Sequence, residues 1–134
     1  MDTKLRIAML VSGGGTTMQR IIRATKCGGL PGVKPALVIA SKPGIGAIDK
    51  GLVEGMYPSA IKVIRPTDFD SPSAFGEAIL HECRTFGVDF IGQYGWLPQT
   101  PGIVVTAYHN MMVNQHPGPL DAGRPDFGGR GMYG

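Results

Sequence analysis

The stretch Leu5-Arg6-Ile7-Ala8-Met9-Leu10-Val11-Ser12-Gly13-Gly14-Gly15-Thr16-Thr17 decides the fold class of this chain. The part up to Val11 is nearly continuously apolar, which is typical of a strand buried on both faces of a parallel sheet. The glycines then predict a tight turn. After the turn, side chains at helical spacing mark one side of a helix that ends near Gly28-Gly29: Met18, Ile21, Ile22 and Thr25.

The same order of strand, turn and helix recurs along the chain. We expect further strands at 36–40, 61–64, 88–92 and 111–114, and further helices at 45–52 and 72–86. Ser71 should cap the last of these helices, with Pro72 in its first position. Gly55 and Gly87 should end the second and third helices. This alternation predicts an α/β fold: a Rossmann-like, open and mostly parallel sheet with helices on both faces.

Length and composition predict one globular domain spanning residues 1–134, because 43% of the 134 residues are hydrophobic. The last part, 121–134, is rich in glycine and is expected to be a loop or tail. No apolar run approaches the ~20 residues of a membrane-spanning helix. The start, Met1-Asp2-Thr3-Lys4, does not resemble a signal peptide. We therefore expect no membrane partner.

Charged and metal-binding side chains argue against two more classes of function. The formal net charge of +3 comes from dispersed Lys and Arg, so no nucleic acid partner is expected. Cys27, Cys83 and the three histidines follow no metal-binding spacing, so no metal site is predicted. The two cysteines also follow no redox spacing, and a cytoplasmic location fits this pattern best. A small anionic substrate remains compatible with the charge.

The glycine-rich turn is a candidate anion site, because backbone N–H groups and the positive end of a helix face a ligand there. The dinucleotide fingerprint fits poorly, since Met18 stands where its third glycine should be. A Walker loop is excluded because no Lys follows the glycines. The alternative is a tight turn that binds nothing. We favour a phosphate bound by five residues: Gly13, Gly14, Gly15, Thr16 and Thr17.

A second stretch, MMVNQHPGPL from Met111 to Leu120, begins as a β-prone strand and turns polar. Asn114 and His116 are two residues apart and project to the same side of an extended chain. A fixed amide donor beside a group that exchanges protons near neutral pH suits a reaction in which an oxyanion forms while an amine loses a proton. The alternative is an ordinary strand-to-loop transition whose side chains bond their own backbone.

The two stretches together resemble the phosphoribosylglycinamide formyltransferases, a branch of the folate-dependent formyltransferase family. Between them, Asp68-Phe69-Asp70-Ser71 and then Val88-Asp89-Phe90-Ile91, leading to Gly95-Trp96, follow in the family's order. The resemblance covers nearly the whole chain and implies the formyltransferase fold with its C-terminal strands missing. It also implies formyl transfer from 10-formyltetrahydrofolate to the amine of glycinamide ribonucleotide, in purine biosynthesis.

The resemblance assigns roles to residues as well. The glycine loop would hold the phosphate of glycinamide ribonucleotide or another sugar phosphate. Asn114 would donate to the tetrahedral oxyanion, and His116 would help it form and collapse by proton transfer. The folate would lie against the segment before the last strand: Tyr94, Gly95, Trp96 and Leu97.

Three departures from the family bear on these expectations. Pro98-Gln99-Thr100 stand where the family has an arginine followed by apolar residues, and Pro72 replaces another common arginine. The family's catalytic aspartate lies on a segment beyond Leu120 that has no match here. We therefore expect an N-terminal part or shortened form with little activity alone. A sheet ending at 111–113 would also leave an apolar edge, which favours a homo-oligomer.

Two alternative functions stay open. One is a non-catalytic sugar-phosphate-binding domain that keeps the glycine loop and has lost the chemistry. The other is a formyltetrahydrofolate hydrolase, with the same Asn and His and with water as the acceptor. The glycine loop argues against the hydrolase, because a hydrolase needs no phosphate cradle.

Overall fold

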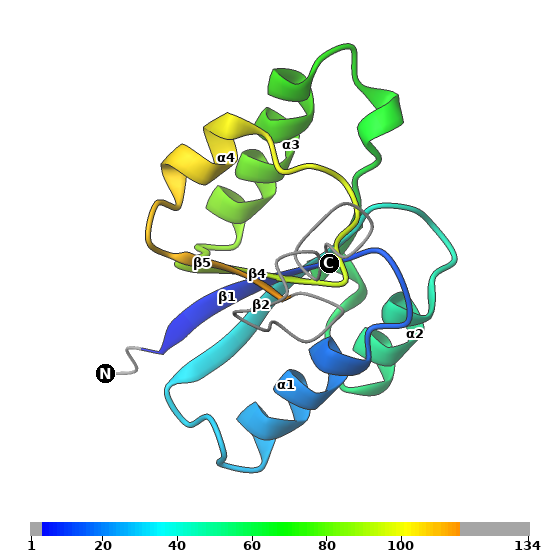
Figure 1. The fold of residues 1–134 in the computed structure, drawn as a ribbon. Helices are drawn as coiled ribbons and strands as arrows, with labels where there is room; N and C mark the ends of the chain where they lie inside the picture. The colour runs from blue at the N-terminus through cyan, green and yellow to red at the C-terminus, as the bar shows by residue number, and fades with distance from the viewer. Residues whose placement is uncertain (1–3, 116–134) are drawn as a thin grey trace, which may run out of the picture.

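The computed structural model describes residues 4–115, which form a parallel sheet between two layers of helices (Figure 1). The sheet has five strands in the order β3-β2-β1-β4-β5. All pairings are parallel, which confirms the predicted fold class. The strands are β1 (Leu5–Val11), β2 (Val33–Ala40), β3 (Ile61–Val63), β4 (Phe90–Tyr94) and β5 (Met112–Gln115).

Two helices cover each face of the sheet (Figure 1). On one face lie α1 (Thr16–Lys26) and α2 (Gly46–Val53), and on the other lie α3 (Pro72–Thr85) and α4 (Gly102–Ala107). Two short 3-10 turns, Pro58–Ala60 and Pro66–Asp68, flank β3. Alternate residues of β1 enter the two cores: Met9 packs with the α1–α2 layer and Leu10 with the α3–α4 layer. This double burial explains the unbroken apolar run in β1.

The predicted helix boundaries on α3 are confirmed in atomic detail. Ser71 is the N-cap, and its hydroxyl accepts a hydrogen bond from the Ala74 N–H at 3.1 Å. Pro72 occupies the first helical position, where its missing N–H costs no hydrogen bond. Gly55 and Gly87, which follow α2 and α3, have φ of 95° and 63°, the left-handed conformation that favours glycine.

Three elements differ most from the sequence-based expectation. β2 begins at Val33, three residues earlier than predicted. β4 begins at Phe90, two residues later than predicted, and α4 was not predicted at all. The residues of α4 are mostly β-branched and disfavour a helix by themselves. Packing stabilises it: a Cβ at Gly76 of α3 would lie only 2.7 Å from the Ile103 side chain, so glycine allows the two helices to approach closely.

β5 lies at the edge of the described sheet and pairs only with β4 there. Val113 on this strand is 44% exposed. These are the features expected of an edge strand, and self-association through it stays a prediction. No helix among residues 4–115 is long and apolar enough to cross a membrane.

The only tryptophan anchors the loop after β4. Trp96 is completely buried and stacks on Phe75 of α3, with ring centroids 6.2 Å apart and an interplanar angle of 9°. Its indole N–H finds no hydrogen-bond acceptor among the described residues. The ring therefore stabilises the fold through apolar and aromatic contact, since no residue in 4–115 accepts a hydrogen bond from its N–H.

A buried carboxylate holds the ends of α1 and α2 together. Glu54, directly after α2, accepts hydrogen bonds from Lys26 and Arg23 at 2.8 Å and from Gln19 at 2.9 Å. These partners, Lys26 foremost, lower the pKa of Glu54 from 4.5 to about 2, although burial acts in the opposite direction. The carboxylate is therefore stabilised in its charged form.

Truncating Trp96 should destabilise the chain much more than replacing it by another ring. We expect Trp96→Ala to lower the free energy of unfolding by about 3–5 kcal/mol, because a buried aromatic side chain leaves a cavity. Trp96→Phe should cost clearly less, since it retains an aromatic ring facing Phe75. Urea unfolding followed by circular dichroism measures both. Equal losses for the two variants would contradict this account.

Glu54→Gln should lower the melting temperature at pH 7, and the difference from the unmodified chain should shrink as the pH falls from 4.5 towards 2. The reason is that a carboxyl group with a depressed folded-state pKa stabilises the fold above its unfolded pKa and loses this contribution on protonation. Glu77→Gln, at an exposed position of α3, is the matched control. A difference that is independent of pH would exclude an electrostatic role for Glu54.

Candidate active site

The carboxyl ends of β1, β4 and β5 lie side by side at one edge of the sheet. After β1 the chain enters α1 on one face, and after β4 it passes to α4 on the other (Figure 1). The chain thus leaves neighbouring strands in opposite directions. In open α/β sheets, ligands bind in the crevice at such a switch point. The glycine loop, the segment after β4 and Asn114 all lie at this edge.

The glycine loop presents a row of backbone N–H groups. No described residue accepts a hydrogen bond from those of residues 13–18. Gly15 is the N-cap of α1, with φ of 75°. A Cβ there would lie 2.6 Å from the Cβ of Ala47, so only glycine fits against α2. This combination of close packing and N–H groups that donate to no described residue is what an anion site at a helix start requires.

α2 brings a positive charge to the same loop. Lys50 Nζ donates to the Gly14 carbonyl at 2.7 Å, and the Ala47 N–H donates to the Gly13 carbonyl at 3.1 Å. Lys50 pairs with no carboxylate among residues 4–115. Its ammonium group therefore adds a positive charge beside the N–H groups of the loop.

Ser12 connects the glycine loop to the segment after β4. Its N–H donates to the Gly95 carbonyl at 2.9 Å, and its hydroxyl accepts from the Leu97 N–H at 2.9 Å. The same hydroxyl lies 2.6 Å from that of Ser41, which follows β2. Ser12 is 3% exposed, so these bonds form away from water. One buried residue therefore joins the ends of three strands.

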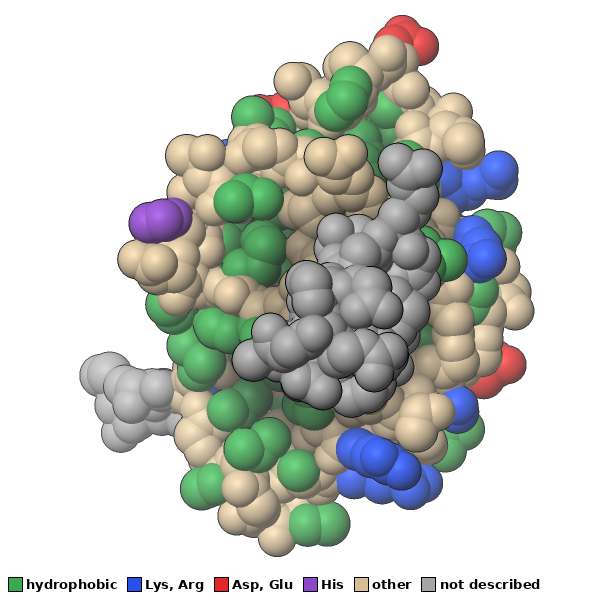
Figure 2. Space-filling model, in the orientation of Figure 1, with side chains coloured by type: hydrophobic (Ala, Val, Ile, Leu, Met, Phe, Trp, Pro, Cys, Tyr) green, Lys and Arg blue, Asp and Glu red, His purple; other side chains and the backbone are tan. Residues whose placement is uncertain are grey.

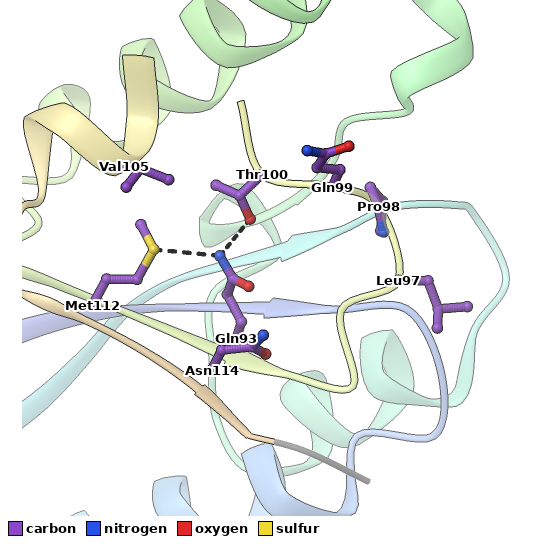
Figure 3. Close-up of a pocket in the computed structure, with 8 residues that line it drawn as sticks. All are labelled: Gln93, Leu97, Pro98, Gln99, Thr100, Val105, Met112 and Asn114. Carbon is purple, nitrogen blue, oxygen red and sulfur yellow. Dashed lines mark hydrogen bonds between the residues drawn. The ribbon is translucent and has the colours of Figure 1, made fainter. Parts of the chain in front are cut away.

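Asn114 lines a cavity of about 550 Å³ beside the carboxyl end of β4 (Figure 3). Asn114 pairs in register with Gln93, and both side chains lie on the face covered by α4. The Gln93 amide is buried and donates to the Thr100 hydroxyl and to the Met112 sulfur. These bonds hold β4, β5 and the loop before α4 around the cavity.

A second cavity, of about 470 Å³, shares Pro98, Gln99 and Thr100 with the first and extends to the start of α3. Among the described residues, no Lys or Arg lines either cavity, and Asp70 is the one charged side chain. The surface shows the same division. In Figure 2, few Lys or Arg side chains are visible near α4 and β5, where hydrophobic and uncharged polar side chains form most of the surface.

The segment predicted to contact folate presents unequal surfaces. Leu97 is 67% exposed and lines the first cavity. The Trp96 ring is buried against Phe75, so Trp96 could contact a ligand only through its backbone. Tyr94 is half-buried, packs on the α1–α2 side, and has a pKa raised by this burial. Gly95 has φ of 71° and turns the chain towards Ser12. The folate assignment of 94–97 stays a prediction.

Several predicted residues fall outside the part of the chain that the structure describes. His116 is one, and the Pro117–Leu120 segment and the tail at 121–134 are others. The structure thus places Asn114 and the glycine loop at one edge and leaves the position of His116 open. Within residues 4–115, no three His, Cys, Asp or Glu side chains gather as a metal site would need.

Four residues whose contacts hold this edge together were not predicted as site residues from the sequence. Ser12 and Ser41 each directly follow a buried strand, and a small polar residue at such a point is a usable signal. Gln93 is an amide within an apolar strand, which predicts a buried hydrogen bond. Lys50 gave no signal, because its contact with Gly14 depends on how α2 packs against the loop.

Comparison with known proteins identifies the family to which this fold and site belong. A family model described as formyl transferase matches residues 5–129. The chain is 31% identical, over 133 residues, to the chloroplastic phosphoribosylglycinamide formyltransferase of Arabidopsis thaliana, spanning 96% of this chain and 42% of that protein. It is 26% identical to the phosphoribosylglycinamide formyltransferase of Escherichia coli K12, spanning 87% of this chain and 53% of the relative.

Solved structures agree with this result. The crystal structure of glycinamide ribonucleotide transformylase 1 from Geobacillus kaustophilus superposes with a TM-score of 0.83 at 32% identity, covering 97% of this chain and 64% of that one. This chain therefore spans from less than half to about two thirds of the length of these relatives. The family match includes the whole sheet, the glycine loop and Asn114. The chain belongs to the formyl transferase family.

Proposed function

We propose that this chain forms the part of a glycinamide ribonucleotide formyltransferase that holds the nucleotide phosphate and one side of the formyl donor. The donor would be 10-formyltetrahydrofolate, and the reaction would belong to purine biosynthesis. The observation that carries the proposal is the convergence, at one switch point of a formyl transferase fold, of the glycine loop, residues 94–97 and Asn114.

The phosphate of glycinamide ribonucleotide would bind to the loop from Gly13 to Thr17. The N–H groups of residues 13–18, which donate to no described residue, and the N-terminal end of α1 suit an anion. Lys50 adds a full positive charge, and a charged donor makes a stronger hydrogen bond to an anion than a neutral one. These features support a sugar phosphate as the substrate class.

The donor would occupy the cavity lined by Leu97, Gln99 and Asn114. Its volume of about 550 Å³ suits part of a folate, and its mixed amide and apolar lining suits a flat heteroaromatic ring. The acidic tail of a folate finds no Lys or Arg partner among the described lining residues. The ring, rather than the tail, would therefore account for recognition by this part of the chain.

Asn114 would act on the formyl carbonyl. The amine of glycinamide ribonucleotide attacks the formyl carbon, and the carbonyl oxygen becomes an oxyanion to which the Asn114 amide donates. The intermediate collapses as the bond from the formyl carbon to the folate nitrogen breaks. The amine then has lost a proton and the folate nitrogen has gained one. His116, by the family resemblance, would carry this proton.

Free thiols at Cys27 and Cys83 fit a reducing compartment, and we place the chain in the cytoplasm on this ground. Burial raises the pKa of Cys83 to about 11, which keeps this thiol protonated and unreactive at neutral pH.

Gly15→Ala should abolish binding of a phosphate ester to the loop. The added Cβ clashes with Ala47 and the residue must adopt φ of 75°, so the loop must move. Gly28→Ala is a matched control at the other end of α1, because its φ is 84° and its Cβ would meet nothing within 4 Å. Calorimetry with ribose 5-phosphate measures both variants. Unchanged affinity in Gly15→Ala would refute phosphate binding at this loop.

Asn114→Ala should lower turnover in any longer version of this protein that transfers formyl groups. The expected loss is on the order of 10²–10³-fold, as for the removal of one oxyanion donor. Gln115→Ala is the control, since Gln115 is the next residue on β5 and does not line the cavity. A labelled-formyl assay compares the two variants, with His116→Ala as a further variant expected to lose activity. Losses under about threefold for both Asn114→Ala and His116→Ala would show that these two residues have only a structural role.

A further inference from the structure

Ser12 is connected to both of the proposed ligand sites. On one side it is covalently joined to Gly13, the first of the residues whose N–H groups donate to no described residue. On the other side, its N–H and its hydroxyl bond the backbone of Gly95 and Leu97, each at 2.9 Å. The pairing of β1 with β4 ends at Leu10 and Gln93, and these bonds continue the contact between the loops that follow the two strands.

We propose that Ser12 is a positioning residue that couples occupation of the glycine loop to the conformation of residues 95–97, and hence to binding of the second substrate. This inference rests on the proposed function, because it assumes a phosphate in the loop. A phosphate that bonds the N–H groups of the loop fixes the backbone directly after Ser12. Since Ser12 is buried and bonded on both its N–H and its hydroxyl, it passes this restraint to Leu97, which lines the folate cavity.

The third contact of Ser12 explains why the link is stiff. Its hydroxyl also bonds the Ser41 hydroxyl at 2.6 Å, which ties it to the end of β2. The Ser12 side chain is therefore held from β2 while it holds the Leu97 N–H, and it cannot rotate away without breaking two bonds. Coupling of this kind is reciprocal, so a ligand at 95–97 should equally favour phosphate binding.

Trp96 lies between the two residues that Ser12 bonds and is the only tryptophan in the chain. Its emission therefore reports on this segment alone. We expect ribose 5-phosphate to change the Trp96 emission of the 134-residue chain, with the same midpoint as its binding measured by calorimetry. It should also raise the affinity for 5-formyltetrahydrofolate by roughly fivefold or more.

Ser12→Ala should still bind ribose 5-phosphate, but the emission change and the gain in folate affinity should both disappear. Ser12→Thr keeps the hydroxyl and should retain them. Ser41→Ala should weaken both responses, because it removes the bond that holds the Ser12 hydroxyl from β2. Thr25→Ala is the matched control, because it removes a part-buried hydroxyl that bonds the Ile22 carbonyl within α1. A merely structural role would lower the stability of Ser12→Ala without separating binding from the emission response.

Hydrogen exchange on the unmodified chain gives a readout that needs no variant. The Leu97 amide should exchange more slowly when ribose 5-phosphate is bound, because its acceptor is the Ser12 hydroxyl. If the unmodified chain binds no ribose 5-phosphate, the proposed function fails and the coupling fails with it. If it binds the phosphate but Leu97 protection is unchanged, or Ser12→Ala responds like the unmodified chain, the coupling alone is refuted.

Discussion

The central strands of this sheet are covered by side chains on both faces, and β1 bears this constraint most heavily. Residues 7–11 are all buried, with neighbours alternating between the α1–α2 layer and the α3–α4 layer. Because both faces are filled by helices, a ligand can reach the sheet only at an edge where strands end. The position of the site thus follows from how the core is packed, before any reactive side chain is considered.

The sequence alone predicted those parts of the fold whose causes are local. The bounds of β1 and the start of α3 at Ser71 and Pro72 agree with the structure, because burial on both faces and helix capping leave marks in a few adjacent residues. The α4 helix left none. Its β-branched residues favour a strand, and its stability depends on Gly76, which is distant in sequence.

The same distinction applies to the site. The glycine loop and Asn114 were visible as motifs, and the structure brings them to one edge of the sheet. The supporting contacts of Ser12 with Leu97 and of Lys50 with Gly14 join residues that are far apart in the sequence. Motifs therefore indicate which groups take part in a site, whereas long-range contacts decide how firmly they are held.

The contact between Gly15 and Ala47 has a consequence for how this family varies. Since the two residues meet where α2 packs on the glycine loop, the space there is shared, and a larger side chain at position 47 would displace the loop as surely as one at position 15. The glycine motif thus extends, in three dimensions, to a small residue on the second helix. A search for sequences that can form this loop would gain specificity by requiring glycine or alanine at position 47 as well as the glycines themselves.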